Sequence, residues 1–311
     1  MFQPDVILHP TDFSESAAAA FRYALQLADR LDSSLHLLNV APAFGDDPIR
    51  GAYEVKLDED SFYQQIRERA DEQVAPFLKE ADAHDVPVTY VHRHDGAPGG
   101  QIVEYVDAEH VDLVVMGTHG RGRIRRALLG SVAQEVVRHA SCSVLTVRHD
   151  VQTDPRDWSR LLVPVDLSEF SAPLLHTAKD MAAAFQASID LLHVVEPLPF
   201  PVPLVGAVTI HDLIPDPTEQ IEKQFDALQK RVDGLPVTVR THVSEGHAAT
   251  TILDAAHELE SDMIVIASHG LSGLERALLG SVTARVVRRA ECPVFVARVE
   301  PEAAEEEEPA E

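Results

Sequence analysis

Short apolar runs alternate with longer stretches of helical periodicity along the first half of the chain. Apolar runs of roughly four to eight residues favour strands, whereas apolar positions that recur every three or four residues favour amphipathic helices. The expected strands are Val6–His9, Leu35–Val40, Val88–His92, Asp112–Met116 and Ser143–Val147. The expected helices are Ser14 to about Leu31, about Ser61 to His84, Gly100 to Ala108 and Ser131 to His139. This alternation predicts an α/β fold, a doubly wound parallel sheet with helices on both faces.

The second half of the chain repeats the first. The sequence ILHPTDFSE at residues 7–15 matches LLVPVDLSE at residues 161–169, at an offset of 154. Cys142 matches Cys292 at an offset of 150, so the copies keep their order and differ by a four-residue deletion. A period this long indicates two whole domains rather than a solenoid.

We therefore expect two tandem domains, residues 1–149 (the first copy) and residues 157–299 (the second copy). The polar segment 149–157 is the expected boundary between them. Residues 300–311 offer no large apolar side chain to bury, so we expect an acidic, disordered tail.

Each copy carries a glycine-bearing turn after its fourth strand. In the first copy, Gly117 is followed by Gly120 and, after nine further residues, by Gly130-Ser131, which opens a helical pattern. Amides at a helix N-terminus attract anions, and glycine lets the backbone approach a phosphate closely. The spacing is neither the dinucleotide fingerprint nor a Walker A sequence. The turn therefore indicates a phosphate-binding site of another kind.

Two residues near this turn also have purely structural interpretations. Asp12 precedes a helix with Glu15 three residues on, which is typical of a helix N-cap. Ser131 with Gln134 has the spacing of a capping box. Capping and ligand contact are compatible, so both interpretations stay open.

The second copy departs from the first at the turn. It has Ala267 in place of the first glycine. The first copy has four arginines in this stretch, Arg121, Arg123, Arg125 and Arg126; the first three match a leucine, a glycine and a glutamate of the second copy, and the fourth matches an arginine. The arginines either form a solvated face or hold phosphate oxygens. The nucleotide site of the second copy is therefore in doubt.

The charge balance is strongly acidic, with 51 Asp and Glu residues against 26 Lys and Arg residues. A nucleic-acid-binding protein would need a basic face, so nucleic acid is excluded as a general partner. High acidity with few lysines resembles salt-adapted cytoplasmic proteins, and an ordinary acidic protein is the alternative. We find no signal peptide and no apolar run long enough for a membrane span. A cytoplasmic location without membrane contact is the expectation.

Catalytic and metal-binding residues are not evident in the sequence. Two cysteines do not make a disulfide framework. His92 and His94 face one side of a strand, yet no third metal ligand accompanies them. His119 and His269 lie inside the turns, but no nucleophile or partner is readable beside them. We expect no metal site and no catalytic residue.

The full set of motifs resembles one family. The spacing Gly-x2-Gly-x9-Gly-Ser, the Pro10-Thr11-Asp12 sequence after the first strand and the Cys-x-Val start of the last strand are similar to the universal stress protein family. The resemblance covers about residues 3–149 and 158–299, so the chain is identified as a tandem member. It implies five-stranded parallel sheets of order 3-2-1-4-5.

The resemblance also implies a ligand, ATP with or without Mg, across the carboxyl ends of the strands. Carried over by position, the site of the first copy comprises Pro10, Thr11, Asp12, Val40, Gly117, Thr118, His119, Gly120, Arg121, Gly122, Arg123, Gly130, Ser131 and Val132. The matching second site comprises Pro164, Val165, Asp166, Val194, Ala267, Ser268, His269, Gly270, Gly280, Ser281 and Val282.

An ATP-binding stress-response or regulatory protein without strong catalysis is the function that this resemblance implies. A slow ATP hydrolase or phosphotransfer enzyme and a nucleotide-independent interaction module are the alternatives. Single-domain members of the family commonly dimerise edge to edge through their last strands. We therefore expect Ser143–Val147 to pair antiparallel with Pro293–Ala297 in an internal pseudo-dimer, with a homodimer of two chains as an option.

Overall fold

The computed structural model describes most of the chain. The described residues are 2–41, 59–94, 96–120, 129–149, 158–196, 217–232, 234, 236–268 and 279–301. They form two compact units. The first unit comprises residues 3–157 with 287–296, and the second comprises residues 1–2, 158–286 and 297–311. Most of the expected boundary, residues 150–157, and the tail from residue 302 onward lie outside the described residues.

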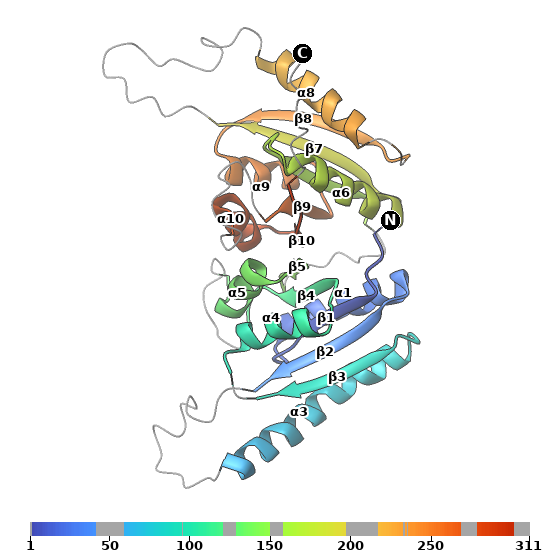
Figure 1. Cartoon of the computed structure of the whole chain (residues 1–311), viewed down its shortest axis with the longest axis vertical. Helices are drawn as coiled ribbons and strands as arrows, with labels where there is room; N and C mark the ends of the chain where they lie inside the picture. The colour runs from blue at the N-terminus through green and yellow to red at the C-terminus, as the bar shows by residue number, and fades with distance from the viewer. Residues whose placement is uncertain are drawn as a thin grey trace, which may run out of the picture. The chain divides into compact units, whose positions relative to one another are not determined.

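The first unit contains a parallel sheet covered by helices (Figure 1). Its strands are β1 (Val6–Pro10), β2 (Ser34–Val40), β3 (Val88–Arg93), β4 (Leu113–Gly117) and β5 (Ser143–Val147). Its helices are α1 (Glu15–Leu31), α3 (Glu59–Asp82), α4 (Pro98–Ala108) and α5 (Ser131–His139). The strand order β3-β2-β1-β4-β5 confirms the predicted order 3-2-1-4-5.

The second unit repeats this arrangement. Its elements are β6 (Arg160–Val165), α6 (Ser171–Phe185), β7 (Ser188–Val195), α8 (Pro217–Arg231), β8 (Val239–Glu245), α9 (Ala248–Glu258) and β9 (Met263–Ala267). The strands β9-β6-β7-β8 pair in parallel in that order. Helix α10 (Ser281–Arg289) and strand β10 (Val294–Ala297) follow in the chain.

Strand β10 adds a further strand to the first unit. Phe295 pairs with Leu145 of β5 in an antiparallel register. The Thr146 hydroxyl donates to the Val294 carbonyl over 3.2 Å. All of these residues belong to the first unit. The expected antiparallel pairing of the two last strands is therefore present, and β5 is not an edge strand.

The first unit buries a histidine on β1. His9 is 0% exposed, and its Nδ1 lies 2.9 Å from the Val115 carbonyl oxygen. Burial lowers the pKa of His9 to about 4. The second copy has Val163 at the matching position, with 0% exposure. The histidine is thus a neutral core residue whose place an aliphatic side chain can fill.

Because the folded state keeps His9 neutral, its contribution to stability is lost as pH falls from about 6.5 to about 4. The loss is on the order of 3 kcal/mol if the unfolded histidine titrates normally. We expect His9→Val to remove this part of the pH dependence. Urea unfolding at pH 7 and pH 4.5 would measure it. An identical slope of unfolding free energy against pH in both proteins would contradict the buried neutral histidine.

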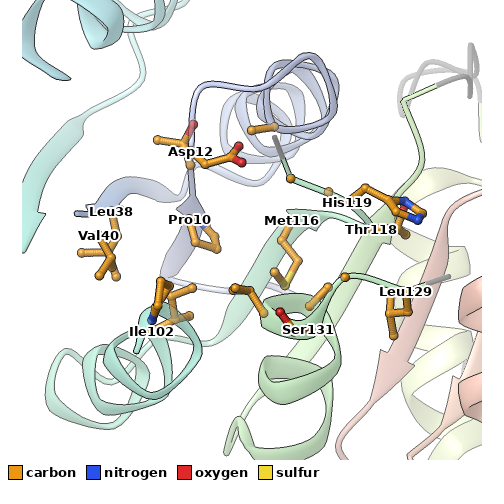
Figure 2. A pocket seen from close by; sticks show the side chains of 18 residues that line it. Pro10, Asp12, Leu38, Val40, Ile102, Met116, Thr118, His119, Leu129 and Ser131 are labelled. Carbon is orange, nitrogen blue, oxygen red and sulfur yellow. The ribbon is translucent and has the colours of Figure 1, made fainter. Parts of the chain in front are cut away.

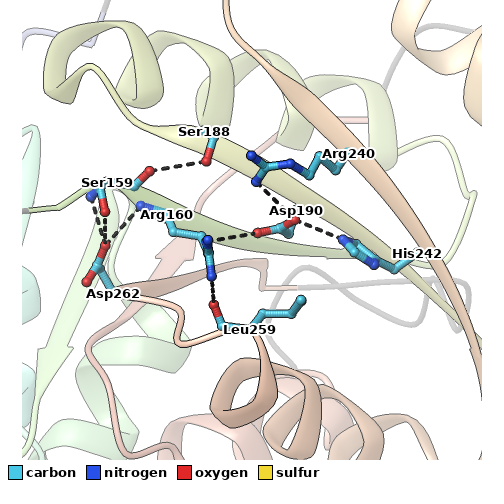
Figure 3. A network of polar contacts seen from close by, with 8 residues as sticks. All are labelled: Ser159, Arg160, Ser188, Asp190, Arg240, His242, Leu259 and Asp262. Carbon is cyan, nitrogen blue, oxygen red and sulfur yellow. Dashed lines mark hydrogen bonds and ion pairs between the residues drawn. The ribbon is translucent and has the colours of Figure 1, made fainter.

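The second unit buries a carboxylate where the first has a histidine (Figure 3). Asp190 on β7, which matches His36 of the first copy, is 1% exposed. Its Oδ1 lies 2.8 Å from His242 Nε2, and Oδ2 lies 3.7 Å from Arg160 Nε. Arg240 Nη1 lies 3.9 Å from Oδ1. Cationic partners on both neighbouring strands thus compensate the buried charge.

Candidate functional site

A cavity of about 540 Å³ lies at the carboxyl ends of the strands in the first unit (Figure 2). We refer to it as the first cavity. The sequence-predicted residues that line it are Pro10, Thr11, Asp12, Val40, Gly117, Thr118, His119, Gly120, Gly130, Ser131 and Val132. The remaining predicted residues, Arg121, Gly122 and Arg123, lie outside the described residues. The structure therefore brings every described member of the predicted set to one cavity.

Several lining residues were missed by the sequence analysis. They are Ala17, Leu38, Pro98, Ile102, Met116, Leu129 and Ala133. Pro98 and Ile102 come from the start of α4, to which no motif pointed. In Figure 2, Leu38, Val40 and Ile102 gather on one side of the cavity, and Thr118, His119 and Leu129 lie on the other. The cavity thus has an apolar end and an end formed by the glycine-bearing turn.

The N-terminus of α5 opens into this cavity. Gly130 is the N-cap, and no side chain in the described part of the chain forms a capping hydrogen bond there. The Gly130 amide donates to the Thr118 carbonyl over 2.8 Å. By helix geometry, the amides of Ser131, Val132 and Ala133 have no acceptor within the helix. These three residues line the cavity, so their amides can serve an anionic group.

The predicted capping roles of two residues are wrong. Ser131 does not cap α5, because the helix begins at Ser131 itself and Gly130 holds the N-cap position. Asp12 does not cap α1, because the Ser14 hydroxyl accepts from the Ala17 amide there. Asp12 Oδ1 instead accepts from the Ser14 amide over 3.0 Å. The Asp12 carboxylate is thus held by a local turn at the cavity wall.

The first two glycines of the motif make room for particular neighbours. A Cβ atom on Gly117 would lie 2.9 Å from the backbone oxygen of Ser16 in α1. A Cβ atom on Gly120 would lie 2.6 Å from Asp12 Oδ2. Gly117 therefore serves the packing of α1 on β4, and Gly120 makes room for the carboxylate. Only Gly130 of the three lies at the helix N-terminus.

His119 lies beside the α5 N-terminus. Its Nδ1 is 3.0 Å from the Thr118 hydroxyl, while Nε2 is buried and has no hydrogen-bond partner among the described residues. An unsatisfied buried nitrogen is costly.

The second unit has a cavity of about 460 Å³ in the same place, the second cavity. The predicted residues that line it are Pro164, Val165, Asp166, Val194, Ala267, Gly280, Ser281 and Val282. Ser268 is not among the lining residues; it is 2% exposed, and its carbonyl accepts from the Gly280 amide. His269 and Gly270 lie outside the described residues.

Other candidate chemistry is not assembled in the part of the chain that the structure describes. No three His, Cys, Asp or Glu side chains there gather as metal ligands. Neither ring nitrogen of His92 has a hydrogen-bond partner among the described residues, and burial lowers the pKa of His92. Burial raises the pKa of the Cys142 thiol to about 12, so it is an unreactive thiol. No helix among the described residues is long and apolar enough to cross a membrane.

The model of the universal stress protein family matches residues 4–148 and again residues 158–298. The chain belongs to this family. Because the two matches occupy both halves, it is a tandem universal stress protein with two family domains. The sequence resemblance is thereby confirmed over nearly the whole chain.

Relatives within the family include archaeal and mycobacterial proteins. A universal stress protein of Methanocaldococcus jannaschii is 31% identical over 145 residues, which are 46% of this chain and 81% of that protein. One of Mycobacterium tuberculosis is 31% identical over 61% of this chain and 63% of that protein. One of Mycolicibacterium smegmatis is 29% identical over 94% of this chain and 96% of that protein. The tandem arrangement thus recurs at full length in this family.

A solved structure of a universal stress protein from Archaeoglobus fulgidus has the same fold. It covers 95% of this chain and 99% of its own, with a TM-score of 0.72 and 21% identity. At that identity the likeness supports the fold alone.

Proposed function

We propose that the first cavity binds ATP, with or without Mg, and that the chain is an ATP-binding stress-response or regulatory protein without strong catalysis. One observation carries the proposal: the N-terminus of α5, where no described side chain forms a capping hydrogen bond, and the Asp12 carboxylate line the same cavity of about 540 Å³. That volume lies in the usual range for small-molecule sites.

The two ends of the first cavity suit the two ends of a nucleotide. Leu38, Val40 and Ile102 offer apolar surface for a base. The amides that begin at Ser131 suit phosphate oxygens. Asp12 can accept from ribose hydroxyls, since a carboxylate is an acceptor. The base, the ribose and the phosphates of ATP would therefore each contact cavity residues of suitable chemistry.

Replacing Asp12 by asparagine tests this proposal. A hydrogen bond to a charged group contributes about 1.5–3 kcal/mol, so Asp12→Asn should weaken Mg-ATP binding about tenfold or more. Asp166→Asn is the matched control in the second unit and should leave the binding unchanged. Calorimetric titration gives both the affinity and the stoichiometry, expected near one ATP per chain. Unaltered affinity in Asp12→Asn, or two equivalent sites, would count against the assignment.

Further parts of the proposal concern the setting in which the protein works. Adaptation to high salt is supported by the acidic composition, and a cytoplasmic location is proposed with it. An internal pseudo-dimer of the two copies is supported by the antiparallel pairing of β5 and β10. A homodimer of two chains stays an option beyond this.

A further inference from the structure

The second cavity keeps the frame of the first but carries different polar groups. Proline, aspartate and valine recur at matching positions as Pro164, Asp166 and Val194, and Gly280-Ser281 again opens a helix at its wall. Its volume is about 460 Å³ against about 540 Å³. The frame therefore fits a ligand of related shape and slightly smaller size.

An additional carboxylate, Glu196, lines the apolar end of the second cavity. Glu196 directly follows β7, and its Oε1 accepts from the Ala248 amide over 2.9 Å. The side chain of His247, the N-cap of α9, makes no capping hydrogen bond within the described residues, and Glu196 serves this helix N-terminus instead. The first copy has Pro42 at the matching position. Val194 and Ile252 line the same end, so a ring held there lies near a carboxylate.

A second acceptor comes from His193 on β7. Its Nδ1 lies 3.0 Å from the Val165 carbonyl oxygen. Because a carbonyl oxygen only accepts, Nδ1 carries the hydrogen, and Nε2 of the neutral ring is an acceptor. The first copy has Asn39 there, which is buried and donates to the Thr11 carbonyl over 2.7 Å. His193 lines the second cavity, so this wall has become richer in acceptors.

The sequence that leads to Gly280 also carries less positive charge than the matching stretch of the first copy. Thr283 replaces Ala133, and its hydroxyl donates to the Ala267 carbonyl over 2.8 Å. The sequence between Gly270 and Gly280 has one arginine and one glutamate, against four arginines in the matching stretch of the first copy. Together with Glu196, these changes make the second cavity a poor site for several negative charges.

We propose that the second cavity binds a purine nucleoside without phosphates, and that Glu196 accepts a hydrogen bond from an amino group on its ring. The nucleoside class rests on the proposed function, because it is taken from the common frame of the two cavities. The preference against phosphate rests on Glu196 and on the loss of arginines before Gly280, and the preference for an amino group rests on Glu196 and His193.

Matched cavity-filling variants separate the two sites. Val40→Trp fills the apolar end of the first cavity, and Val194→Trp fills that of the second. We expect Val40→Trp to bind one adenosine per chain. Its affinity for adenosine should be about tenfold or more higher than its affinity for ATP. It should exceed the affinity for inosine by the same factor, because inosine has a carbonyl oxygen in place of the amino group. Adding Val194→Trp to Val40→Trp should abolish adenosine binding. Glu196→Gln, which keeps the shape and removes the charge, should narrow the preference for adenosine over ATP.

Calorimetry with each ligand, after thermal melting has shown that each variant folds, decides the matter. If Val194→Trp fails to fold, Ile252→Phe fills the same end. The inference is overturned if Val40→Trp binds ATP more tightly than adenosine. It is also overturned if adding Val194→Trp or Ile252→Phe leaves the affinity for adenosine unchanged. Val194→Trp leaves the first cavity open, so its failure to bind ATP would contradict the proposed function of that cavity. If Val40→Trp still binds adenosine, the inference about the second cavity stands.

Discussion

Replacing Gly130 with valine is expected to weaken Mg-ATP binding by about 100-fold or more, since several charge-assisted hydrogen bonds from the α5 amides would be lost together. A Cβ atom at this position would lie 3.2 Å from the Thr118 carbonyl oxygen, which accepts the Gly130 amide. The two methyl groups of valine need further room at the N-terminus of α5. Valine is also a poor N-cap residue. Calorimetric titration of wild type and variant measures the loss.

Gly280→Val is the matched control for this experiment. It occupies the same place before α10, where a Cβ atom would lie 3.4 Å from the Ser268 carbonyl oxygen. Both variants lose a favourable cap, so they should show similar changes in melting temperature. Only Gly130→Val should lose ATP. Equal affinity for ATP in Gly130→Val and wild type would remove the α5 N-terminus from the binding site.

The largest expected effect on stability comes from Phe295 on β10. It is 1% exposed and pairs with Leu145 of β5, which is also 1% exposed. Truncating a buried phenylalanine to alanine costs about 3–5 kcal/mol, and a buried leucine about 2–5 kcal/mol. Phe295 and Leu145 face each other in the strand pairing. The double alanine variant should therefore lose less unfolding free energy than the sum of the two single-variant losses, by about 0.5 kcal/mol or more.

A double-mutant cycle by urea unfolding measures this coupling. Thr146→Val is a useful companion, because it removes only the hydroxyl that donates to the Val294 carbonyl and keeps the size of the side chain. Additive costs for Phe295→Ala and Leu145→Ala would show that the two strands do not meet in solution. In that case the pseudo-dimer proposal would lose its support.

Much of the fold could be predicted from the sequence because helix-covered parallel strands have a simple pattern. Strand β4 is buried along nearly its whole length, and its apolar run was predicted within one residue at each end. The start of α4 was less accurate. It begins at Pro98 rather than Gly100, because proline suits the first helical turn even though it ends helices elsewhere.

The candidate site was only partly predictable. The glycine spacing located the turn and the N-terminus of α5, because glycines tolerate close neighbours and Gly130 directly precedes the helix. It did not distinguish the roles of the glycines: Gly117 accommodates the Ser16 backbone rather than a ligand. Ile102 and Met116 were missed because an apolar residue that lines a cavity has the same periodicity as one in the core. Only the tertiary structure separates these two cases.

The assignment of residues 287–296 to the first unit bears on how the chain is made. The ribosome releases β1 to β5 long before β10, which pairs with β5 across a separation of 148 residues between Thr146 and Val294. Until then β5 presents an unpaired apolar edge, a feature that invites association between nascent chains. Pairings this distant in sequence also form slowly. The first unit therefore completes its folding only after the second half of the chain has been synthesised. A chain that ended near residue 157 would keep β5 as an unpaired, aggregation-prone edge strand.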